Sequence, residues 1–338
     1  TIEISSTTIF KIVFIILGLF LFYYILDIVV IFLLSLIIAS TVRVWVKSLT
    51  KFKIPKIVAI IFIYGLTLSL MILFLSVIIG PLTQEIASFS DKIPGYYQNI
   101  NDVISQYVDT ESLGKISPNF SGLSADSVGQ FKTLGTNIFG LLVRLFGGLT
   151  SFFSVVIISF YLAFEETGIE KVLRILTPLK YEDYVLDLWF KTELKFSRWL
   201  SSQLILGLVI GISIYIGLTL MGIPYPLLLA IVAGLLEIVP FVGPIISAIT
   251  GILIAFSVSA KIGLITTAFY LIINQIENNI IIPLLMKKVI GLHPVVIIIV
   301  LMIGFKLYGI MGMIIAVPLT TVLDQLIKDL ADKKQISF

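Results

Sequence analysis

Residues 262–285 read IGLITTAFYLIINQIENNIIIPLL, an apolar run long enough to cross a bilayer that carries a polar block in its middle. A carboxylate such as Glu277 is costly near the middle of a membrane and normally faces the protein interior, a water-filled cavity or a partner. At helical spacing the polar side chains fall on two adjoining faces and form one broad stripe. Its members are Asn274, Gln275, Glu277, Asn278 and Asn279. The block therefore predicts a functional site, and the alternative is a packing seam in which amides hydrogen-bond across a helix bundle.

The composition is that of a polytopic membrane protein. Of the 338 residues, 58% are hydrophobic and only 13% are charged, so a soluble domain of this length could not cover the apolar surface. The net charge of +3 is spread along the chain without a basic block, and nucleic acid is not expected as a partner. With no cysteine and one histidine, the sequence offers no disulfide, thiolate metal site or histidine cluster. We expect no metal and no cofactor, and the lipid bilayer as the main surroundings.

Charge and hydropathy divide the chain into four parts. Residues 43–56 contain five basic residues and no acidic one, which marks this loop as cytoplasmic. The N-terminus is then expected inside as well. The lysines near the C-terminus indicate that this end is also cytoplasmic. The parts are N-terminal membrane helices that serve as a scaffold (1–80), an extracytoplasmic segment (81–137), a span followed by cytoplasmic amphipathic helices (138–199) and a C-terminal transport unit (200–338).

Several element boundaries follow from local signals. The first apolar run, residues 9–26, lacks a charged leader and a small-residue cleavage site, so it is expected to remain as a span. A later span is expected to stop at Gly80-Pro81. The basic, amphipathic residues 165–199 predict a helix pair at the membrane surface, with a separate span at 200–221.

Glycines within the span at 200–221 have a structural interpretation. Gly207 and Gly211 are four residues apart and therefore lie on one helix face. This spacing is common where two helices approach closely, so we assign these glycines to packing and give them no chemical role.

Two apolar segments, 226–257 and 294–325, are each longer than one untilted span needs, and each is interrupted in its middle. Proline removes a backbone donor and glycine adopts conformations that other residues avoid, so both breaks expose main-chain polar groups at membrane depth. Such backbone is tolerated only where it lines a cavity or is buried in protein. The residues expected to shape the breaks are Pro240, Gly243, Pro244, Gly309, Gly312 and Pro318.

Paired interrupted segments in two related halves are the best sequence indication of a transporter binding site. If both segments re-enter the membrane as hairpins, Lys287 and Lys288 between them are cytoplasmic, which the positive-inside tendency favours. The two units then form an inverted repeat. If both segments cross fully, the same lysines move to the outside, and this topology stays open as the alternative.

Three stretches carry a family resemblance: GLLEIVPFVGPIISAI at 234–249, NQIENNIIIPLLMKKVIGLHPVVIII at 274–299 and YGIMGMIIAVPLTTVL at 308–323. With them the chain resembles the autoinducer-2 exporter (AI-2E) family of bacterial and archaeal membrane proteins, over nearly its whole length except 81–137. The resemblance implies an all-α polytopic fold with about eight membrane segments, a homo-oligomer and transport. It also implies autoinducer-2 export, sodium or lithium/proton antiport or a role in sporulation, so it does not fix the substrate.

Three ionisable residues are the main candidates for chemistry. Glu277 is the first candidate for a proton or cation carrier, and Glu237, next to the first break, is expected either to line the same cavity or to tie the hairpin to a neighbour. Lys306 at the second break should pair with Glu237 or Glu277. His293 is expected to cap a turn. The candidate coordinating oxygens belong to Asn274, Gln275 and Asn278, with Asn279 in the same polar block.

The sequence thus predicts a secondary transporter of the plasma membrane, not an enzyme, since no acid pair, nucleophile with a base or metal cluster is recognisable. One hypothesis is exchange of sodium or lithium for protons, because hard cations prefer oxygen ligands. Another is export of a small polar solute such as autoinducer-2. A third, of a different class, is a membrane scaffold or assembly factor that acts through its extracytoplasmic segment.

Overall fold

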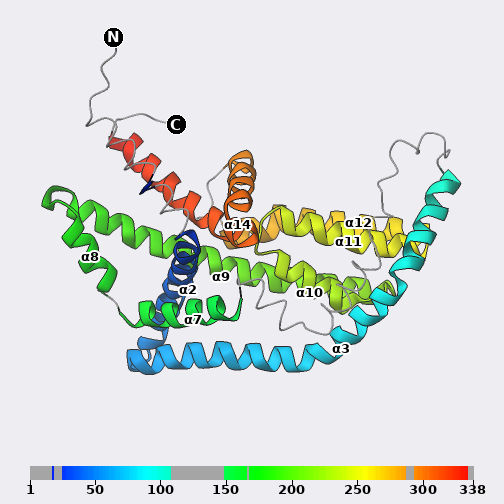
Figure 1. Ribbon diagram of the computed structural model, residues 1–338, viewed down its shortest axis with the longest axis horizontal. Coiled ribbons are helices and arrows are strands. Elements are labelled where there is room, and N and C mark those ends of the chain that lie inside the picture. The colour runs from blue at the N-terminus through cyan, green and yellow to red at the C-terminus, as the bar shows by residue number, and fades with distance from the viewer. Residues whose placement is uncertain (1–16, 19–24, 108–147, 166, 287–292, 334–338) are drawn as a thin grey trace, which may run out of the picture.

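The computed structural model describes residues 17–18, 25–107, 148–165, 167–286 and 293–333, and every regular element within them is helical (Figure 1). The all-α prediction is confirmed. The elements are α2 (Leu26–Thr50), α3 (Lys56–Tyr107), α7 (Leu149–Phe164), α8 (Gly168–Leu176), the 3-10 turn η2 (Leu179–Tyr181), α9 (Glu182–Leu220), α10 (Pro226–Leu236), α11 (Val242–Val258), α12 (Ala260–Ile276), the π-helical turn η3 (Glu277–Ile281), α13 (Ile282–Met286) and α14 (Pro294–Lys333).

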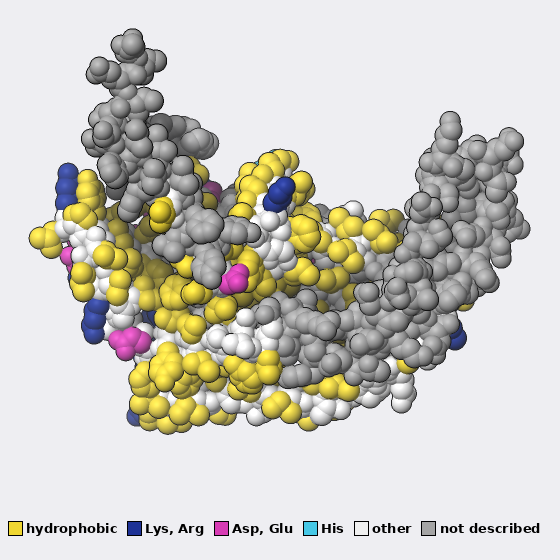
Figure 2. Space-filling view, in the orientation of Figure 1, with side chains coloured by type: hydrophobic (Ala, Val, Ile, Leu, Met, Phe, Trp, Pro, Cys, Tyr) yellow, Lys and Arg dark blue, Asp and Glu magenta, His cyan; other side chains and the backbone are white. Residues whose placement is uncertain are grey.

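The membrane character of the chain is visible in its helices and on its surface. Five helices in the described residues are long and apolar enough to cross a membrane, or six if α7 and α8 count as one bent span. The expected number of about eight is not confirmed, and the predicted span at 9–26 lies mostly outside the described residues. Hydrophobic side chains cover much of the described surface in Figure 2, as expected for a protein surrounded by lipid.

Both predicted breaks are present. In the first, α10 ends at Leu236 and α11 begins at Val242, with Phe241 at a positive φ of 64°. In the second, Tyr308 and Gly309 depart from helical geometry inside α14.

The chain folds back on itself at the second break. A methyl group added at Gly304 would lie 2.5 Å from the carbonyl oxygen of Gly312. Eight residues of straight helix would separate these two positions by about 12 Å, so the arms of α14 must reverse direction between them. Glycine at both positions lets the two backbones touch.

The residues expected to shape the breaks have different roles. Pro240 lies between α10 and α11, and Pro244 lies in the first turn of α11, where a missing N–H costs little. Gly243 packs directly against the backbone of Leu236, which closes the first break. Pro318 does not shape a break, because it lies inside the second arm of α14 well beyond Gly309. That prediction is wrong, and helix packing tolerates the proline there because neighbouring elements bury it.

Two predicted boundaries are also wrong. α3 continues without interruption through Gly80 and Pro81, and the hydroxyl of Thr83 donates to the carbonyl oxygens of Ile79 and Gly80 in the same turn. Likewise, residues 182–220 form one helix, so the amphipathic stretch up to residue 199 leads directly into the predicted span.

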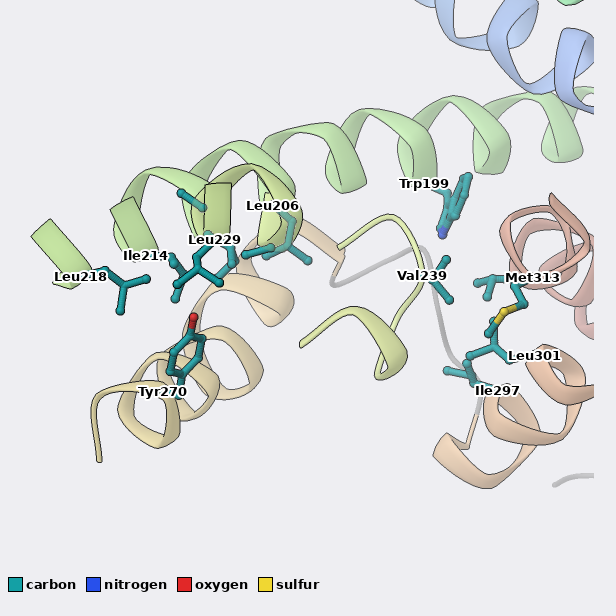
Figure 3. Packing of buried hydrophobic residues seen from close by; sticks show 14 of the residues in the cluster. Trp199, Leu206, Ile214, Leu218, Leu229, Val239, Tyr270, Ile297, Leu301 and Met313 are labelled. Carbon is teal, nitrogen blue, oxygen red and sulfur yellow. The ribbon is translucent and has the colours of Figure 1, made fainter. Parts of the chain in front are cut away.

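α9 is the central element of the bundle. It packs against α10, α2, α14, α12 and α13, and its buried side chains Trp199, Leu206, Ile214 and Leu218 belong to the largest hydrophobic core (Figure 3). The glycines predicted to allow close packing do so: a methyl group at Gly207 would lie 2.6 Å from the carbonyl oxygen of Gly234 in α10. α9 and the first arm of the broken segment are therefore in backbone contact.

This contact predicts a strong steric effect. Gly207→Ala should destabilise the protein by about 1–3 kcal/mol, because the methyl group meets a backbone atom that cannot move aside easily. Thermal unfolding in detergent, followed by fluorescence-detected size exclusion, measures the loss. Gly65→Ala is the matched control, since nothing lies within 4 Å of the added methyl group there. Equal melting temperatures for both variants would contradict the tight contact.

Candidate functional site

Glu237 is placed by the first break. It follows the last residue of α10, and its side chain is only 2% exposed. The side-chain amide nitrogen of Gln203 in α9 donates a hydrogen bond to the carbonyl oxygen of Glu237. A methyl group at Gly207, one turn further along α9, would lie 3.6 Å from Cβ of Glu237. The acid therefore lies directly against α9.

Glu277 is placed by a change in helix type. It begins η3, the π-helical turn between α12 and α13, and is 5% exposed. The N–H of Ile282 donates to the carbonyl oxygen of Glu277, which is the wide spacing of a π-helix. π-helical turns of this kind occur frequently at functional sites.

The two acids meet. The side-chain carboxyl groups of Glu237 and Glu277 lie within hydrogen-bonding reach of each other, although 40 residues separate them in the chain. Two carboxylates at this separation repel each other strongly unless they share a proton, as in known carboxyl pairs. Oε2 of Glu237 is buried and has no donor among the described residues. The two acids therefore lie together, and a shared site for them stays a prediction.

Gln203 is a polar member of this site that no sequence pattern singled out. Gln203 is 3% exposed, and its oxygen Oε1 is buried without a hydrogen-bond donor among the described residues. Its sequence signal is weak, because Gln203 directly follows two serines and lies four residues before Gly207. The site thus combines an acid from the first break, an acid from the π-helical turn η3 and an amide from the central helix α9.

Comparison with known proteins identifies the family. A family model described as AI-2E family transporter matches residues 12–332. The chain belongs to the AI-2E transporter family.

Relatives in bacteria support membership of this family. YrrI of Bacillus subtilis (strain 168) is 32% identical over 164 residues, which cover 48% of this chain and 46% of that protein. YueF of the same organism is 26% identical over 256 residues, 73% of this chain and 69% of the relative. YhhT of Escherichia coli (strain K12) is 32% identical over 127 residues. The chain spans about half the length of YrrI. These relatives are named for transport, and their names state no substrate.

The amides of the polar block at 274–279 do not share the buried position of Glu277. Gln275, Asn278 and Asn279 are exposed, and Asn274 is half-buried. The side-chain nitrogen of Asn278 donates to the backbone and side-chain oxygens of Asn274, both at 2.9 Å, and Asn279 does the same to Gln275 at 2.9 and 2.8 Å. The predicted single stripe is therefore split into a buried acid and a surface ladder of amides that pair within their own helix.

The predicted ion pair of Lys306 is wrong. Its side chain is exposed next to the second break, and it forms no salt bridge with Glu237 or Glu277, which contact each other instead. Both acids are buried whereas Lys306 is exposed, so its charge stays outside their contact. His293 caps a turn as predicted, since its Nδ1 accepts a hydrogen bond of 3.3 Å from the N–H of Val295.

Basic residues of the predicted cytoplasmic side brace the bundle. Arg43 in α2 forms a largely buried ion pair with Glu193 in α9 and donates through Nη2 to the carbonyl oxygen of Leu162 at 2.7 Å. Lys56 donates to the carbonyl oxygen of Phe164 at 2.8 Å. Cations at these positions stabilise the C-terminal carbonyls of α7. The charge pattern alone indicated topology and did not show this bracing.

The exposure of Lys306 predicts that its charge is dispensable for folding. Lys306→Met should change the free energy of unfolding by less than about 0.5 kcal/mol, as at other exposed positions without a partner. Thermal unfolding in detergent checks this. A large loss of stability would show that the lysine has an acidic partner.

The buried ion pair of Arg43 and Glu193 should be more sensitive to substitution than Lys306. Arg43→Met leaves the carboxylate of Glu193 without its partner and should destabilise the protein by about 2 kcal/mol or more. In the double variant R43M/E193L much of this loss should be recovered, because no unpaired charge remains. The same unfolding assay applies to both variants, and equal instability of the single and double variants would contradict the pairing.

Proposed function

We propose that this AI-2E transporter is a secondary transporter that exchanges sodium or lithium for protons, with Glu237 and Glu277 as the exchanging groups. The observation that carries the proposal is the contact between the two buried carboxyl groups. A carboxyl pair at this separation needs a positive charge between its members, and either a proton or a small cation can supply it. One site would therefore bind the two ions in turn.

The charges balance in such an exchange. With one shared proton the pair carries one negative charge. When a monovalent cation replaces that proton, both carboxylates are ionised and the net charge of the occupied site is again minus one. The site therefore changes its occupant without adding a net charge to the apolar interior, where an uncompensated charge is expensive.

We further propose a topology for this exchange. Both broken segments re-enter the membrane as hairpins, both termini are cytoplasmic, and the protein works as a homo-oligomer in the plasma membrane. α10 supports the hairpin proposal, because its 11 residues span only about 16 Å, much less than the apolar thickness of a bilayer. Residues 200–338 would move against the scaffold formed by α2, α3 and α7.

Export of a small polar solute is the second candidate. The exposed amides on α12 and η3 carry both donors and acceptors, and the buried Nε1 of Trp199 on α9 has no acceptor among the described residues. A hydroxyl oxygen of a solute such as autoinducer-2 would accept from this indole, and the amides retain further hydrogen-bonding capacity for such a solute. The carboxyl pair would then couple export to proton entry.

The experiment follows the internal pH of proteoliposomes. With an acidic interior, external sodium or lithium should raise the internal pH as cations enter and protons leave. Glu237→Gln and Glu277→Gln should each slow this response by at least about tenfold, and the double variant should be no worse than either single one, because the pair acts as a unit.

Glu165→Gln is the control, because it removes an exposed acid at the end of α7 and should leave the rate unchanged. A wild-type protein that is folded and shows no response to sodium or lithium would exclude cation exchange. Uptake of labelled autoinducer-2 into the same vesicles, driven by an imposed pH gradient, would then test the second candidate.

A further inference from the structure

We propose that Gln203 completes a binding site for a dehydrated sodium or lithium ion, with its oxygen Oε1 as a ligand beside the carboxylates of Glu237 and Glu277. This inference rests on the proposed exchange of cations. It adds a neutral ligand from the central helix α9, outside both broken segments.

The orientation of the Gln203 amide is fixed at one end. Its nitrogen donates to the carbonyl oxygen of Glu237, so the nitrogen has a partner in the break. Gln203 as a whole is only 3% exposed. Its side-chain oxygen is buried and has no donor among the described residues. A buried amide oxygen without a donor is costly, and native proteins rarely leave one unless a ligand or water completes it.

The Gln203 side chain lies at one member of the acid pair, because its nitrogen contacts the carbonyl oxygen of Glu237. Glu237 packs against α9 at Gln203 and Gly207, and it lies within hydrogen-bonding reach of Glu277. Oε2 of Glu237 also lacks a donor. Gln203 and Glu237 therefore each have a buried side-chain oxygen without a donor, and Gln203 is the neutral member of the two.

The chemistry of these groups favours a cation. Carboxylate and amide oxygens are the ligands that hard cations prefer, and an acceptor without a donor attracts a positive charge. A neutral third ligand contributes an oxygen without adding a negative charge that would have to be buried. The absence of a side chain at Gly207 leaves Glu237 in direct contact with α9, which keeps the amide and the acid close.

Cation-dependent stability of the purified full-length protein tests the site. A ligand that binds only the folded state raises its melting temperature, so sodium and lithium should stabilise the wild type relative to choline at equal ionic strength. The apparent dissociation constant follows from the dependence of the melting temperature on cation concentration. In Gln203→Met it should rise at least about tenfold, because the oxygen ligand is lost.

The matched control is Ser202→Ala. The hydroxyl of Ser202 donates to the carbonyl oxygen of Leu285 at 3.1 Å, so it braces α9 against α13 from the neighbouring position. This variant should lower the melting temperature at every cation concentration and leave the apparent dissociation constant unchanged. A purely structural Gln203 would behave in the same way as this control.

The outcomes separate the two proposals. If Gln203→Met binds sodium and lithium as tightly as the wild type, the role of Gln203 is overturned while cation exchange stands. If the wild type itself shows no stabilisation by either cation over choline, the cation site fails together with the exchange on which it rests.

Discussion

The backbone contact between α9 and α10 at Gly207 and Gly234 is the constraint on which the site depends. No side chain fits between the helices there, so the end of α10 lies directly against α9. The first break then begins next to Gln203, whose amide satisfies a carbonyl that the break leaves exposed. Irregular backbone at membrane depth is stable only with such partners. The position of Glu237 is a consequence of this packing.

The two broken segments differ in what surrounds them. The first presents Glu237 to α9 and η3 and contributes to the main core through Leu229, Ala233 and Val239. Figure 3 shows the indole of Trp199 on α9 pointing toward Val239 in this break. The arms of the second segment join two cores: Ile297 and Leu301 pack in the main core, while Met311 and Ile315 pack with Val30 and Leu34 of α2. The second broken segment thus connects the main core with the N-terminal helix α2.

Local sequence signals predicted the elements well where they were regular. The hydropathy of the spans, the break at Pro240 and the break at Gly309 follow from short-range chemistry, because apolar length and backbone freedom are properties of a few neighbouring residues. Helix ends were less certain. Pro81 and the charged residues before position 200 predict boundaries, yet both helices continue through them because helical hydrogen bonding outweighs the local preference.

The sequence by itself determined that the chain is helical, that it belongs in a membrane and that Glu277 is an unusual residue for its surroundings. Only the tertiary structure decided that Glu237 is its partner, that Lys306 is not, and that the neighbouring amides lie at the surface. The physical reason is that helical spacing fixes which residues share a face, whereas contacts between distant segments depend on how the faces pack. Gln203 shows this most clearly, since its position opposite Glu237 follows from two glycines that meet across α9 and α10.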